Sequence, residues 1–150
     1  MPETIMRSYG IQHPAPHGRS VSMGLVWAGL LAAPAAWSLQ LLVSYGLASH
    51  ACFPRDYLYA RVVPGWGWIM PALVAINIAA LAVACIGTAI SYRNWSRISQ
   101  EASGGHTRLL EAGEGRTRFL AVWGIWSGIW FAIAIVFDTI AVFAVPLCGS

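Results

Sequence analysis

The sequence predicts an all-α membrane protein with three transmembrane helices, and two observations lead to this fold class. Of its 150 residues, 57% are hydrophobic and only 10% are charged, whereas a soluble domain carries about 25% charged residues. Three apolar stretches, at 21–49, 66–92 and 119–147, exceed the roughly 20 residues needed to cross a hydrocarbon core. None of them contains Lys or Arg, and Asp138 is their only acid.

The first stretch is preceded by a polar segment at 1–20 that contains three prolines and is typical of a loose tail. The predicted organisation is therefore a polar tail followed by one membrane domain at 21–150. The small residues around Pro34 resemble the cleavage region of a secretory signal. Because the apolar run continues through Val43, we expect this stretch to remain a membrane helix.

The basic residues predict the orientation of the chain. All nine are Arg; seven lie in the tail or in the second connection, and two lie in the first connection. The positive-inside rule then places the N-terminus in the cytoplasm and the C-terminus in the periplasm of a bacterial inner membrane. The net charge of +3 needs no nucleic-acid partner, because cytoplasmic arginines face anionic lipid head groups.

Each predicted helix carries one strongly polar residue at a similar distance from its outer end, namely Gln40, Asn77 and Asp138. Such groups are costly against lipid, so we expect them to meet inside the bundle, with Ser44 and Thr139 nearby. The cluster either sets the helix register or relays protons through Asp138. We favour the first, because no second carboxylate, histidine or arginine continues a path toward the cytoplasm. A third reading, in which Asp138 reaches the outer head groups, stays open.

Small residues share a helical face with these polar side chains. Gly124 and Gly128 form a G-x-x-x-G pair on the face of Asp138, a pattern that lets helix backbones approach closely. The predicted packing residues are Gly124, Gly128, Ala132, Gly29 and Ala33. The opposite face of the third helix carries Trp123, Trp126 and Trp130, which we expect to contact lipid or a partner protein.

Cys52 and Cys148 lie just past the outer ends of the first and third helices, so we expect them to form a disulfide in an oxidising compartment. The alternative is two unpaired thiols. With His50, those thiols would suit redox or metal chemistry.

Haem in a membrane bundle needs histidine ligands within the helices, and the three apolar stretches contain none. His13, His17 and His106 lie in polar segments, and nucleotide-binding and nucleophile motifs are absent. We expect no catalytic residue, metal site or cofactor in this chain.

The first helix, "GLLAAPAAWSLQLLVSYGLASHAC", and the "PLC" after the third resemble small bacterial membrane proteins associated with haem-copper terminal oxidases. The resemblance implies an accessory or assembly subunit, with haem and copper only in its partner subunits. The positions that carry the resemblance are Gly29, Pro34, Trp37, Tyr45, Cys52 and Cys148.

Three functional hypotheses follow. The first is a non-catalytic accessory or assembly subunit of a larger respiratory complex of the inner membrane, surrounded by other membrane subunits and lipid. The second is a small oligomeric transporter or proton-conducting protein that uses Asp138. The third is a periplasm-facing redox or metal-handling protein that uses His50, Cys52 and Cys148.

Overall fold

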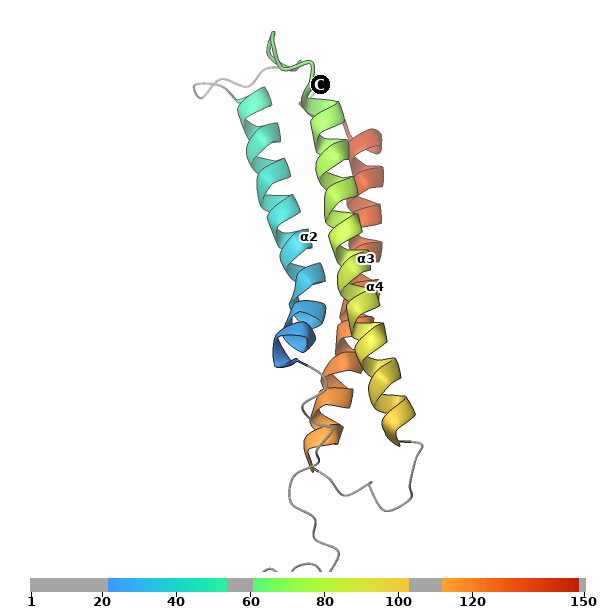
Figure 1. Ribbon diagram of the computed structural model, residues 1–150. Helices are drawn as coiled ribbons and strands as arrows, with labels where there is room; N and C mark the ends of the chain where they lie inside the picture. The colour runs from blue at the N-terminus through green and yellow to red at the C-terminus, as the bar shows by residue number, and fades with distance from the viewer. Residues whose placement is uncertain (1–21, 54–60, 103–111, 149–150) are drawn as a thin grey trace, which may run out of the picture.

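The computed structural model describes residues 22–53, 61–102 and 112–148, and within them the side chains of residues 22–53, 61–99 and 117–148. These residues form three long helices that lie side by side (Figure 1): α2 (Met23–Cys52), α3 (Ile69–Ala102) and α4 (Ala112–Ala144). The predicted polar tail at 1–20 lies outside the described residues.

All three helices are long and apolar enough to cross a membrane, which confirms the predicted fold class. Their apolar spans contain 30, 31 and 28 residues, or about 42 to 46 Å at 1.5 Å per residue. This exceeds a hydrocarbon core of about 30 Å. The spans therefore tilt or extend into the head-group layers.

The helix boundaries differ from the predicted ones. α3 continues through Ala102, although the sequence analysis assigned residues 93–102 to a connection. These residues are polar, but no glycine or proline interrupts them before Gly104. α4 likewise begins at Ala112 rather than at residue 119. Polar composition marks where a helix leaves the hydrocarbon, and it does not mark where the helix ends.

Proline explains where two helices end. α2 stops at Cys52, and the next residue, Phe53, directly precedes Pro54. α4 stops at Ala144, and the next residue, Val145, precedes Pro146. A residue before proline is sterically disfavoured in the helical region, so both helices end one residue earlier.

A disulfide between Cys52 and Cys148 joins the end of α2 to the segment after α4, with their Cα atoms 5.4 Å apart. We call this the disulfide end of the bundle. Both half-cystines are buried, next to an apolar cluster of Ala51, Ile69 and Leu73. The predicted bridge is present, and it occupies both thiols on which the redox or metal hypothesis depends.

The three helices approach closely at a glycine junction, formed by Gly29 of α2, by Gly87, Thr88 and Ser91 of α3, and by Gly124 and Gly128 of α4. A Cβ atom added to Gly29 would lie 3.4 Å from the carbonyl oxygen of Gly87. One added to Gly124 would lie 3.6 Å from the carbonyl carbon of Gly29. The missing side chains thus allow backbone-to-backbone contact.

Of the other packing residues, Ala33 is fully buried in an apolar cluster next to the junction, and Ala132 packs against that cluster. The sequence analysis did not identify Gly87 and Ser91 as part of the packing surface. Their spacing of four residues is the small-x-x-x-small pattern, which could have identified them as packing residues.

Candidate functional site: a polar belt and two lateral grooves

Asn77 is the centre of a polar belt across the bundle. Its side-chain amide group donates to the Leu73 carbonyl at 2.8 Å, and its Oδ1 accepts from Gln40 Nε2 at 3.0 Å. The Thr139 hydroxyl lies 3.3 Å from the same oxygen and 2.8 Å from the Ile135 carbonyl. Asn77 is 1% exposed, so the belt links all three helices inside the bundle.

These contacts determine which way both amides point. A flipped Asn77 would place its oxygen against the Leu73 carbonyl, and a flipped Gln40 would place its oxygen against Asn77 Oδ1. Both alternatives put two acceptors together. Gln40 therefore presents Oε1 away from Asn77, and this enclosed oxygen has no hydrogen-bond partner in the structure as described.

Asp138 and Ser44 differ from the prediction. Asp138 accepts a hydrogen bond from Trp37 Nε1 at 3.1 Å, and no hydrogen bond to Gln40 or Asn77 is present. The Ser44 hydroxyl is enclosed without a partner among the described residues. The predicted five-residue cluster is therefore a three-residue belt of Gln40, Asn77 and Thr139, beside a separate Trp37–Asp138 pair.

Trp37 explains the position of Asp138. Its ring packs against Phe131 at a centroid distance of 5.3 Å, and this contact orients the indole N–H toward Asp138. The helical phase of Asp138 gives its face on α4 and does not indicate an indole donor on another helix. Trp37 is the aromatic residue nearest to Gln40 in the sequence of α2, and this proximity could have identified it as a donor to Asp138.

One lateral groove lies between α2 and α3, and we call it the alanine groove. Its volume is about 500 Å³. Half of its lining is alanine, Gln40 is its one amide residue, and the rest is aliphatic. The lining residues are Ala32, Ala35, Ala36, Leu39, Gln40, Val43, Ile76, Ala79, Ala80 and Val83.

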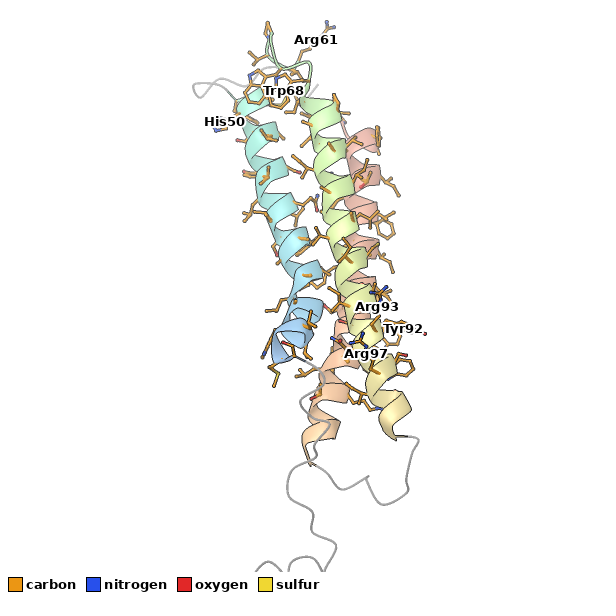
Figure 2. All side chains as sticks on the ribbon, in the orientation of Figure 1. His50, Arg61, Trp68, Tyr92, Arg93 and Arg97 are labelled. Atoms are coloured by element: carbon orange, nitrogen blue, oxygen red, sulfur yellow. A yellow bond between two sulfur atoms is a disulfide. The ribbon has the colours of Figure 1, made fainter. Side chains whose placement is uncertain are left out.

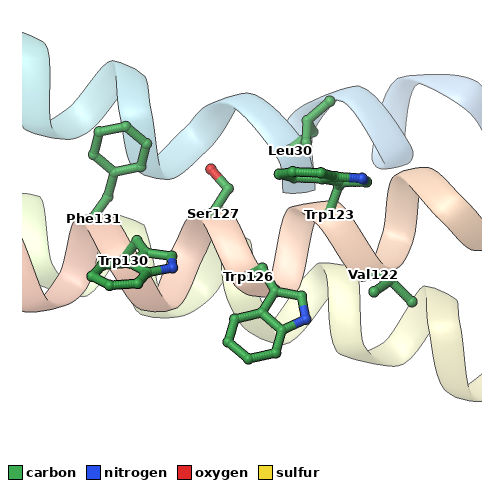
Figure 3. Close-up of a pocket in the computed structure, with 7 residues that line it drawn as sticks. All are labelled: Leu30, Val122, Trp123, Trp126, Ser127, Trp130 and Phe131. Carbon is green, nitrogen blue, oxygen red and sulfur yellow. The ribbon is translucent and has the colours of Figure 1, made fainter.

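A second groove lies along α4 beside α2, and we call it the tryptophan groove (Figure 3). Its volume is about 680 Å³. Among the tryptophans of the predicted lipid or partner face, Trp123 lies on the α2 side of α4 next to Leu30, and Trp126 projects on the opposite side. The Ser127 hydroxyl points toward α2. The lining residues are Leu30, Val122, Trp123, Trp126, Ser127, Trp130 and Phe131.

The two ends of the bundle differ in their polar side chains (Figure 2). His50, Arg61 and Trp68 lie at the disulfide end, whereas Arg93 and Arg97 lie in the other half of the molecule. Within residues 22–53, 61–99 and 117–148, no three His, Cys, Asp or Glu side chains are grouped as a metal site. His13, His17 and His106 lie outside these residues.

Comparisons with known proteins return no relative. No family model matches the chain, no curated protein is significantly similar to it, and no solved structure matches it.

Proposed function

We propose that this chain is a non-catalytic accessory or assembly subunit of a larger complex in the bacterial inner membrane, and that the complex is a terminal oxidase. The alanine groove is the observation that supports this function best. The likeness of the first helix to oxidase-associated proteins supports the choice of complex, and the arginine distribution supports a cytoplasmic N-terminus.

The alanine groove has the composition of a helix-docking surface. Transmembrane helices associate through small residues, which let backbones approach closely, and through polar side chains, which bond across the interface. The groove has alanines on both helices, including Ala35 and Ala79, which are exposed in the isolated chain. Gln40 also lines the groove, although its Oε1 is enclosed within the isolated chain.

A second copy of the chain fits this groove less well than a different protein does. A two-fold dimer brings the same patch of both subunits together. In such a dimer the alanine groove of one copy faces the alanine groove of the other, and the space between the two copies stays unfilled. A lipid acyl chain could fill the volume. A helix of another subunit fills it as well, and the alanines on both walls let its backbone approach closely.

Filling the groove is the first test. Ala79→Leu places a bulky side chain in the groove, whereas Ala82→Leu makes the same change at an exposed alanine of α3 that does not line it. We expect native purification of the tagged Ala79→Leu chain in mild detergent to recover at least about tenfold less haem than the parent chain, since a loss of about 1.4 kcal/mol weakens binding tenfold. Ala82→Leu should recover the parent amount.

Both variants should give the same amount of folded chain in the membrane. Equal haem recovery from the two variants would refute docking through this groove. A parent chain that purifies without haem would refute the oxidase assignment.

A further inference from the structure

The tryptophan groove differs in kind from the alanine groove, and its chemistry indicates a different occupant. Tryptophan side chains project far from the α4 backbone, so they keep a partner helix at a distance. Trp123, Trp126 and Trp130 are each more than half exposed. Small-molecule sites are concave and mainly apolar or aromatic, with a few placed polar groups and volumes of roughly 300 to 1,000 Å³. The volume of about 680 Å³ lies in this range.

The depth of the groove limits what can satisfy its polar groups. The α4 span begins at Thr117 and contains 28 residues. Trp123 lies about 9 Å and Trp130 about 20 Å from that start, at 1.5 Å per residue. The groove therefore extends from near one head-group layer to the middle of the membrane. Near the middle, neither water nor lipid esters are available as acceptors.

The groove presents several donors that form no hydrogen bond with the described residues. The three indole N–H groups make no hydrogen bond within that part of the chain, and neither does the Ser127 hydroxyl. On the facing helix, Pro34 has no N–H, so the Leu30 carbonyl lacks its usual donor four residues later. Donors outnumber acceptors in the groove, which favours a ligand that carries acceptor oxygens.

The aromatic lining of the groove also favours a ligand that contains a flat ring. Indole faces are electron-rich, and they stack favourably on flat rings in offset arrangements. Phe131 adds an aromatic face to the lining, and its ring packs against Trp37 at a centroid distance of 5.3 Å. A saturated acyl chain provides neither a ring nor an acceptor at this depth. A lipid-soluble quinone provides an electron-poor ring, two carbonyl acceptors and an apolar tail.

We propose that the tryptophan groove binds a lipid-soluble quinone, with a ring carbonyl accepting from the Ser127 hydroxyl and an indole N–H. The ring lies against Trp123 and Trp130, which flank Ser127 on α4, and the tail continues along the groove into the lipid. This is a binding site, and it requires no electron transfer to the protein. It does not rest on the accessory-subunit function, because it uses a different surface.

Quenching of tryptophan fluorescence by decyl-substituted benzoquinone tests the site in the full chain reconstituted in nanodiscs. We expect saturable quenching above the linear background that membrane partitioning produces. Ser127→Ala should weaken the apparent Kd about tenfold, because it removes a hydrogen bond at a site without water. This variant keeps all eight tryptophans, so its signal compares directly with the parent. Ser127→Thr keeps the hydroxyl and should retain binding.

Trp123→Leu and Trp130→Leu should abolish the saturable component. Trp68→Leu is the matched control, because Trp68 is similarly exposed and lies at the disulfide end. Decylbenzene, which lacks the carbonyls, should not compete with the quinone. Purely linear quenching, equal loss in Trp68→Leu, an unchanged Kd in Ser127→Ala, or effective competition by decylbenzene would each overturn the proposal.

Discussion

Replacing Gly128 by leucine is expected to destabilise the bundle by about 3 kcal/mol or more, at the upper end of what overpacking costs. A Cβ atom at this position would lie 3.0 Å from Thr88 Cβ and 3.4 Å from Thr88 Cα. The nearest atoms are the hydroxyl oxygen and Cβ of Thr88; rotating the hydroxyl does not move Cβ, so a leucine side chain forces the helices to separate. The midpoint of unfolding in mixed detergent micelles with increasing SDS measures the effect.

Gly46→Leu is the control for this substitution. Gly46 also lies inside a membrane helix, and an added Cβ there meets no heavy atom within 4 Å. We expect a change within about 0.5 kcal/mol, as for substitutions at positions without contacts. Equal unfolding midpoints for Gly128→Leu and the parent would show that the glycine junction is not a close contact.

Replacing Asn77 by leucine is expected to cost about 2 kcal/mol. The change removes the acceptor of Gln40 Nε2, and it leaves a buried amide without either of its partners. An unsatisfied buried polar group costs about 1 to 3 kcal/mol. The same SDS titration measures the loss.

Thr139→Val provides the comparison for Asn77→Leu. It removes one bond to Asn77 Oδ1 at 3.3 Å but leaves the bond from Gln40 in place. Bonds between membrane helices contribute about 0.6 kcal/mol on average, so Thr139→Val should be the milder change. A larger loss in Thr139→Val than in Asn77→Leu would place the centre of the belt elsewhere.

The sequence predicted the three helices because their apolar length is a direct physical requirement of the membrane. It predicted the disulfide because Cys52 and Cys148 follow the same ends of their helices. It missed the helical residues 93–102, since polar residues outside the hydrocarbon can continue a helix. Hydropathy indicates which residues lie in the hydrocarbon and which lie in water. Helix-breaking residues such as Pro54 and Pro146 indicate where a helix ends.

The polar groups could be predicted only in part. Helical phase gives the face of one helix, and it does not give the rotation of that helix against its neighbours. Gln40 and Asn77 face each other, but Asp138 lies toward Trp37 because the contact between Trp37 and Phe131 orients the indole. The two grooves could not be predicted at all, because each is formed by side chains of two helices.

Docking of a partner subunit in the alanine groove is the central functional claim, and short-range cross-linking in native membranes tests it most directly. In a Cys85→Ala background, which removes the free cysteine of the described chain, a cysteine is placed at Ala79 or at Ala82. We expect Ala79→Cys to cross-link to a haem-containing oxidase subunit and Ala82→Cys to remain uncross-linked. Cross-links of equal yield at both positions, or a product from Ala79→Cys that contains only this chain, would contradict the account.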